Sequence, residues 1–261
     1  MEKRTQQLQA FDRLLTIMDE LRSQCPWDRK QTFESLRHLT IEETYELSDA
    51  LLADDVEEVK KELGDLLLHI VFYAKIGSEL SAFDIADVAN EICDKLIQRH
   101  PHVYGDVEVR NEEEVKQNWE QIKLKEGRKG VLAGVPKGLP SLVKAHRMQE
   151  KAAGVGFDWK KTEDVALKIQ EELGEFLVEV QNGDSLKTEA EFGDLIFSLV
   201  NYARFMGINA DDALARTNQK FVDRFELMEQ QLQDRGKKIS DLDLDALEKL
   251  WQSAKEMSKS D

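Results

Sequence analysis

Apolar residues recur three or four positions apart through most of the chain, and this spacing predicts amphipathic helices. The pattern predicts one helix over 40–53 and a second over 56–76, with two aspartates between them. Thr40 and Glu43 have the form of a capping box, so we expect the first helix to begin at Thr40. Because the connection is short, the two helices should be antiparallel neighbours.

The second half of the chain shows the same arrangement. Its pattern predicts helices over 163–181 and 185–206, joined by a turn at Asn182-Gly183-Asp184. Thr188 with Glu191 forms another candidate helix cap. Further helical patterns cover 85–99, 112–126, 211–235 and 245–257. No segment alternates convincingly as a strand would, so the predicted fold class is all-α.

An acidic pattern occurs twice, and its five positions are separated by the same offset of 129 residues. They are Glu42, Glu43, Glu46, Glu62 and Asp65 in the first half, and Glu171, Glu172, Glu175, Glu191 and Asp194 in the second. Flanking matches keep the same order: 27–32 with 157–162, Lys95 and Arg99 with Lys220 and Arg224, Trp119 and Lys123 with Trp251 and Lys255. This agreement predicts tandem duplicated helical units over 1–126 and 141–261, joined by a linker over 127–140.

Charge and composition narrow the functional classes. A net charge of −16 argues against a nucleic-acid-binding surface, which would show a basic face. Two cysteines form no disulfide framework, the first residues lack the apolar stretch of a signal peptide, and the longest apolar run is too short to span a bilayer. We therefore expect a cytoplasmic protein that binds neither nucleic acid nor membrane.

The spacing of the repeated acids suggests a metal site. Residues three apart share one helix face, so Glu172 and Glu175 point the same way, as do Glu191 and Asp194. Antiparallel packing would then bring four carboxylates together, which is repulsive without a cation. Oxygen ligands without paired cysteine or histidine suit Mg²⁺, with Mn²⁺ as a substitute. One or two such ions would bind phosphate oxygens and activate a water molecule.

The repeated acids have two other interpretations. An isolated E-E-x-x-E on an acidic protein is usually a solvated helix face, but Asp65 and Asp194 lie beside apolar residues and need partners. A di-iron carboxylate bundle would use E-x-x-H motifs, and no glutamate here has histidine three residues after it. The duplicated spacing therefore favours a Mg²⁺ site.

The two acidic sets resemble those of the all-α nucleoside triphosphate pyrophosphohydrolase superfamily. Four further segments, 25–28, 99–103, 138–142 and 155–159, make the chain similar to its MazG family over almost the entire length. The resemblance implies Mg²⁺-dependent hydrolysis of ribo- and deoxyribonucleoside triphosphates to monophosphate and pyrophosphate. It also implies an intertwined homodimer and attack of water on the α-phosphorus.

Site residues follow from the resemblance position by position. The implied metal ligands are Glu172, Glu175, Glu191 and Asp194 in the second half and Glu43, Glu46, Glu62 and Asp65 in the first. The implied nucleotide contacts are Lys220, Arg224, Trp251 and Lys255, with Lys95, Arg99, Trp119 and Lys123 at a second nucleotide site.

Basic residues distinguish the two halves. Lys168 and Lys187 precede Glu172 and Glu191 by one turn, whereas Leu39 and Glu58 hold the matching places in the first half. We therefore expect the second half to be the principal hydrolase, with Lys168, Lys187 and Glu171 near substrate. Two alternatives stay open. The lysines form intrahelical ion pairs of little consequence, or the chain is a nucleotide- or metal-sensing scaffold without turnover.

Overall fold

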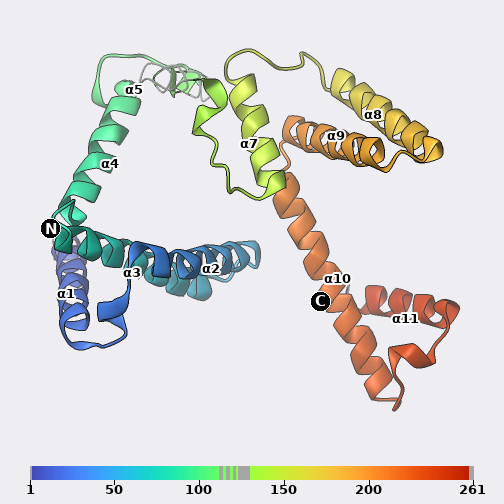
Figure 1. Cartoon of the computed structure of the whole chain (residues 1–261), viewed down its shortest axis with the longest axis horizontal. Helices are drawn as coiled ribbons and strands as arrows, with labels where there is room; N and C mark the ends of the chain where they lie inside the picture. The colour runs from blue at the N-terminus through green and yellow to red at the C-terminus, as the bar shows by residue number, and fades with distance from the viewer. Residues whose placement is uncertain (1, 112–113, 116–117, 120–121, 123–129, 259–261) are drawn as a thin grey trace. The chain divides into compact units, whose positions relative to one another are not determined.

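The computed structural model describes residues 2–111, 114–115, 118–119, 122 and 130–258. Within these residues every regular element is a helix, which confirms the predicted all-α class (Figure 1). By its internal contacts the chain divides into two units, Met1–Arg110 and Asn111–Asp261, each with one acidic set. The expected helix over 112–126, including Lys123, falls largely outside the described residues. No helix among those described is both long and apolar enough to cross a membrane.

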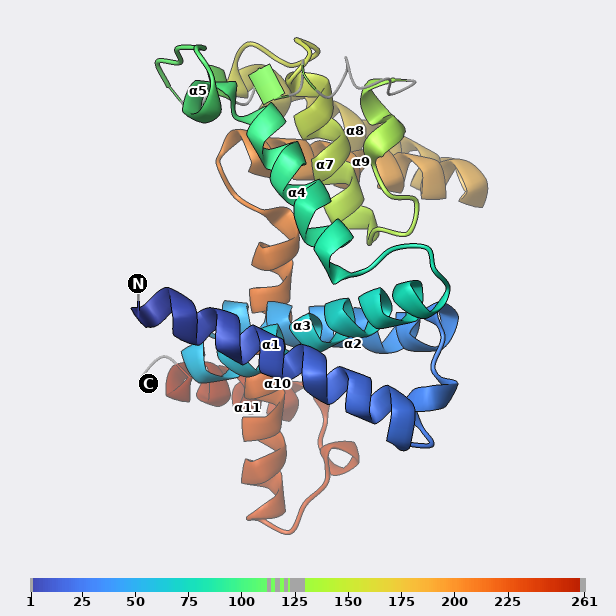
Figure 2. The same ribbon diagram turned by 90° about the vertical axis from the view of Figure 1, so that its left-hand side faces the viewer.

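The first unit is built on a helical hairpin. Its elements are α1 (Glu2–Gln24), η1 (Asp28–Lys30), α2 (Phe33–Leu52), α3 (Val56–Glu79), α4 (Ile85–Arg99) and α5 (Pro101–Tyr104). Helices α2 and α3 pack as the hairpin, and α1 lies against α3 (Figure 2). Its core comprises Met18, Leu36, Val71, Phe72 and Ile76. The predicted antiparallel pair is therefore present.

The start predicted for α2 was wrong. The helix begins at Phe33, because Thr32 accepts a hydrogen bond from the Ser35 backbone amide and the Ser35 hydroxyl accepts one from the Thr32 amide. Thr40 lies inside the helix instead. Its hydroxyl is 2.7 Å from both His69 Nδ1 and Tyr73 Oη on α3. Thr40 therefore ties α2 to α3 rather than capping α2.

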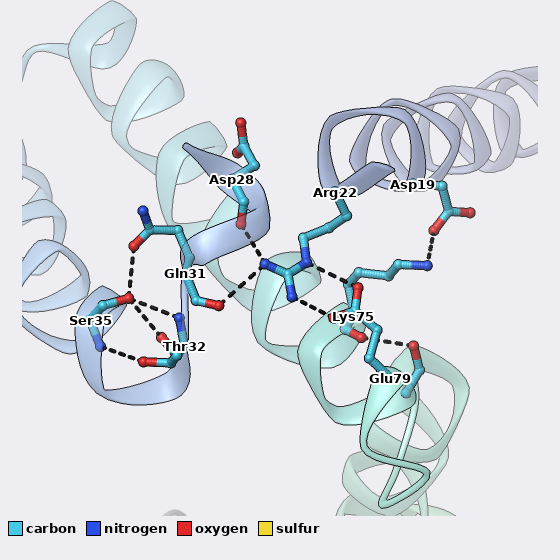
Figure 3. Close-up of polar contacts among 9 residues, drawn as sticks. Asp19, Arg22, Asp28, Gln31, Thr32, Ser35, Lys75 and Glu79 are labelled. Atoms are coloured by element: carbon cyan, nitrogen blue, oxygen red, sulfur yellow. Dashed lines mark hydrogen bonds and ion pairs between the residues drawn. The ribbon is translucent and has the colours of Figure 1, made fainter. Parts of the chain in front are cut away.

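A guanidinium group fixes the loop between α1 and α2 (Figure 3). Arg22 on α1 donates to the backbone carbonyls of Asp28 and Gln31 and, through Nε, to Glu79 at 3.0 Å. Lys75 on α3 also pairs with Asp19 on α1 at 2.7 Å. The side chain of Arg22 thus satisfies loop carbonyls and joins α1 to α3.

The second unit contains two hairpins. Its elements are η2 (Val131–Gly134), α7 (Ser141–Ala153), α8 (Thr162–Asn182), α9 (Ser185–Phe205), α10 (Ala210–Gln233), η3 (Ile239–Asp241) and α11 (Leu244–Met257). Helices α8 and α9 form the first hairpin, and α7 packs on α9. Helices α10 and α11 form the other around Met228, Leu232, Leu250 and Ala254.

The turn between α8 and α9 lies where the sequence placed it. Gly183 adopts a φ of 73°, a left-handed conformation that glycine takes without steric cost. The predicted cap at Thr188 was wrong, since Asp184 caps α9 by accepting from the Lys187 amide. The Thr188 hydroxyl donates to the Asp184 carbonyl instead. Asn182-Gly183-Asp184 therefore ends one helix and begins the next.

Gly77 permits a close approach between α3 and the segment before α4. A Cβ at this position would lie 2.8 Å from the Phe83 ring and 2.9 Å from the Phe83 carbonyl oxygen. We expect Gly77→Ala to lower the free energy of unfolding of the first unit by about 1–3 kcal/mol, the usual cost of overpacking. Thermal denaturation beside Ser78→Ala, a change at an exposed neighbour, measures this effect. Equal stability of the two variants would contradict the close approach.

Candidate functional site

The second unit gathers three of its four predicted metal ligands. Glu172 and Glu175 lie one turn apart on α8, and Glu191 faces them from α9. One carboxylate oxygen from each lies within 4.8 Å of the others. The cluster follows from the i,i+3 spacing on α8 and from the hairpin that brings α9 alongside. Asp194 is exposed and stands at the edge of this group.

Burial and like charge shape this cluster. Glu172 is only 6% exposed and accepts an ion pair from Lys168 at 2.7 Å, while Lys168 also donates to Glu171 at 2.8 Å. These two carboxylates raise the pKa of Lys168 well above its usual value. Burial, followed by the charges of Glu175 and Asp194, raises the pKa of Glu191. The cluster therefore holds more negative charge than one lysine offsets.

The first unit holds a matching cluster of Glu43, Glu46 and Glu62, whose oxygens also lie within 4.8 Å of one another. Glu62 is 1% exposed, and its Oε2 atom is buried without a hydrogen-bond partner. Burial is the main cause of the raised pKa of Glu43 and Glu46, and the charge of Asp65 adds to it at Glu43. The repeat in sequence is therefore a repeat in geometry.

Each cluster includes one lysine, but from opposite helices. In the first unit Lys61 on α3 donates to Glu62 at 2.9 Å, which holds the pKa of Glu62 below its usual value. In the second unit Lys168 on α8 forms an ion pair with Glu172. Leu39 stands at the position that matches Lys168, and the cation of the first cluster is Lys61, which pairs with its neighbour Glu62 on α3. Lys61 therefore provides the partial compensation that the sequence suggested for the first half.

Lys187 lies at the start of α9 and forms an ion pair with Asp184 at 3.7 Å. Its ammonium group therefore lies beside the residue that caps α9.

The basic and aromatic residues of α10 and α11 form a contact of their own. The guanidinium carbon of Arg224 lies 5.8 Å from the Trp251 ring centroid, and Arg224 Nε donates to Ser258 at 3.3 Å. Trp251 also packs against Phe221. Lys220 is exposed and Lys255 half-buried. The contacts recorded for Arg224 and Trp251 do not include the α8–α9 carboxylates.

The corresponding residues of the first half are less completely described. Lys95 pairs with Glu91 at 3.8 Å, Arg99 is half-buried in the last turn of α4, and Trp119 is half-buried. Lys123 lies outside the described residues. The second nucleotide site predicted there stays a prediction.

Comparison with known proteins decides the family. The profile described as MazG nucleotide pyrophosphohydrolase domain matches residues 31–104 and 160–227. The chain belongs to the MazG family. Each match spans one helical hairpin and its acidic set, so the duplication is one of MazG domains.

Near full-length relatives support this assignment. The nucleoside triphosphate pyrophosphohydrolase of Escherichia coli K12 is 42% identical over 257 residues, 95% of this chain and 98% of that protein. The nucleoside triphosphate pyrophosphohydrolase/pyrophosphatase MazG of Thermotoga maritima is 44% identical over 250 residues, 94% of this chain and 95% of that protein. A Bacillus subtilis protein, YabN, is 43% identical over 257 residues, and the match spans 52% of its length.

The carboxylate clusters fit a hard divalent cation. Each presents only oxygen atoms, as Mg²⁺ and Mn²⁺ prefer. Burial of like charges at short range is unfavourable unless a cation or proton compensates. The unpartnered Oε2 of buried Glu62 is an available ligand atom. The MazG clusters therefore have the donor chemistry of a magnesium site.

Replacing Glu191 by glutamine should raise the melting temperature of the metal-free protein at pH 7–8. The pKa of Glu191 is raised above its ordinary 4.5, so stability contributed by its protonated form is lost as pH rises through the raised value. A neutral amide avoids that loss, and the advantage should shrink as the pH falls toward 4.5. Thermal melts in chelator, with exposed Glu189→Gln as control, test this. A lower melting temperature for Glu191→Gln at every pH would contradict it.

Proposed function

We propose that this chain hydrolyses nucleoside triphosphates, ribo- and deoxyribonucleotides alike, to the monophosphate and pyrophosphate with Mg²⁺. The observation that carries the proposal is a cluster of three glutamates that occurs in both helical units. Each cluster offers only carboxylate oxygens as metal ligands. The names of the relatives from Escherichia coli and Thermotoga maritima support the reaction. Hydrolysis breaks the bond between the α-phosphorus and the bridging oxygen, and the oxygen of water enters at phosphorus.

In the second unit Glu172, Glu175, Glu191 and Asp194 would hold the metal. When bound, Mg²⁺ neutralises phosphate charge and lowers the pKa of water. Lys168 pairs with Glu172 and would donate to a phosphate oxygen of the bound substrate.

Exposed apolar side chains support a homodimer. On α8 and α9, Leu173, Leu177, Phe192 and Leu199 are each more than two-fifths exposed. Large exposed apolar faces usually mark an interaction surface. A second copy would cover the hairpin and can bring Lys220 and Arg224 of one chain to the carboxylates of the other. Sedimentation should show a dimer, and a monomer at micromolar concentration would contradict this part.

Product analysis tests the proposed reaction. The protein is incubated with Mg²⁺ and each common nucleoside triphosphate, and products are separated by ion-exchange chromatography. Monophosphate and pyrophosphate in equal amounts are expected. Diphosphate with phosphate would place the cleavage at the wrong bond. Saturable nucleotide binding without product would instead favour the sensing scaffold.

A further inference from the structure

A further carboxylate extends the acidic cluster of the second unit toward the turn at Gly183. Glu179 follows Glu175 by four residues on α8, and Glu175 follows Glu172 by three, so the three side chains share one helix face. Helix α9 lies alongside α8 as the second arm of the hairpin (Figure 1). Burial is the main cause of the raised pKa of Glu191 on α9, and the charge of Glu179 is one of the further causes. The Glu179 carboxylate therefore lies within electrostatic range of the cluster.

Glu179 has no charged partner in the described part of the chain. The side chain is half-buried, and its Oε2 atom is buried without a hydrogen-bond partner. Lys187, which stands where the first unit has Glu58, pairs with Asp184 and not with Glu179. Because a buried carboxylate oxygen without a partner is costly, this oxygen is available to a cation.

The first unit has a cation on this side of its cluster instead of a carboxylate. The offset of 129 residues pairs Glu179 with Ala50, which is buried. The same offset pairs Ala190 with Lys61, and Lys61 donates to Glu62 at 2.9 Å near the start of α3. A lysine therefore compensates this side of the first cluster, whereas the second cluster has a further carboxylate there.

The other three glutamates form a group that does not include Glu179. Oxygens of Glu172, Glu175 and Glu191 lie within 4.8 Å of one another, close enough to share one ion. Glu179 lies seven residues beyond Glu172, which is about 10 Å along the axis of an α-helix. Ligand oxygens lie only about 2.0–2.1 Å from Mg²⁺. An ion within the group therefore leaves Glu179 unused, and a second ion beside Glu175 is needed to engage it.

We propose that Glu179 holds a second divalent cation in the second unit, with Glu175 as the carboxylate shared between the two ions. The inference rests on the proposed function, because it extends the Mg²⁺ site assigned there. Paired ions of this kind lie roughly 3.5–4 Å apart and stabilise both the attacking and the leaving oxygen of a displacement. Rotation about the last side-chain bond exchanges the two Glu179 oxygens, so Oε2 can turn toward an ion. With Ala50 at the matching position, the first unit has no ligand for such an ion.

The number of bound Mn²⁺ ions tests the inference without turnover. Metal-free protein is titrated with Mn²⁺ in the absence of nucleotide, and free Mn²⁺ is measured by its EPR signal. Glu179→Gln keeps the size of the side chain and should bind one ion fewer per chain than wild type. Glu163→Gln, the same change at an exposed site on α8, should bind as many ions as wild type. Equal binding by Glu179→Gln and wild type overturns the proposal.

The EPR spectrum of the bound Mn²⁺ provides a second readout. Two ions that share Glu175 should be exchange-coupled, and a coupled pair gives a multiline spectrum that isolated ions do not give. Wild-type protein should show this spectrum, and Glu179→Gln should show only that of isolated ions. A structural role of Glu179 alone would leave the coupled spectrum unchanged. A wild-type spectrum of isolated ions overturns the shared site.

Glu172→Gln distinguishes this inference from the proposed function on which it rests. Glu172 belongs to the three-glutamate group, so this variant should weaken Mn²⁺ binding whether or not Glu179 is a ligand. Weaker binding by Glu172→Gln together with unchanged binding by Glu179→Gln would overturn the second ion and leave the proposed metal site intact. Wild-type protein that binds no Mn²⁺ would overturn both.

Discussion

Replacing Glu175 by alanine is expected to reduce pyrophosphate release about 100-fold or more. Changes to residues that merely support metal ligands often cost about 10–100-fold, so loss of a ligand itself should cost at least as much. Glu175 is exposed and belongs to the second-unit cluster, so the loss should not arise from unfolding. Steady-state turnover with saturating Mg²⁺ measures the effect, and Glu163→Ala at an exposed site on α8 is the control.

The matched change in the first unit should have a smaller effect. Glu46→Ala removes the corresponding carboxylate, but we propose that the second unit is the principal hydrolase. Lys168 and Lys187 support this preference, because Leu39 and Glu58 hold the matching places in the first half. Turnover of Glu46→Ala should stay within about twofold of wild type. Equal loss in both variants would contradict the asymmetry.

Removal of divalent cations should lower turnover about 100-fold or more. The concentration of Mg²⁺ that restores half of the activity should rise as pH falls. The pKa of Glu191 is raised, so protons compete with the metal at a higher pH than for an ordinary glutamate. Titration of chelator-treated protein with Mg²⁺ at pH 6 and pH 8 measures this shift.

Mn²⁺ provides the control for metal removal. It prefers similar oxygen ligands and should restore turnover after chelation. Activity that survives chelation, or a Mg²⁺ requirement independent of pH, would contradict the role of the carboxylates as ligands.

Spacing along the sequence was sufficient to predict the clusters. Residues one turn apart on a helix share a face, and the short turn at Gly183 brings the second helix back along the first. Glu172, Glu175 and Glu191 therefore met as expected, as did their counterparts in the first unit. Both predictions depend only on helix spacing and a short turn. The repeat shows the same spacing twice in one sequence, which is why it could be recognised.

Features that depend on tertiary packing were not predicted. Two of the three buried residues of α7 are polar, Gln149 and Lys151, so its apolar pattern is weak and the helix was missed. Only Met18 is buried on α1, which obscured that helix in the same way. Lys60 and Lys61 were expected to compensate the first acidic set only in part, and Lys61 does pair with its neighbour Glu62 on α3.

Hydrolysis in water labelled with ¹⁸O tests the central claim most directly. Attack on the α-phosphorus transfers the water oxygen to the nucleoside monophosphate and releases unlabelled pyrophosphate. Mass spectrometry of both products after a single turnover should therefore find the label only in the monophosphate. Label in the pyrophosphate would mean attack on the β-phosphorus and would contradict the reaction proposed for these carboxylates.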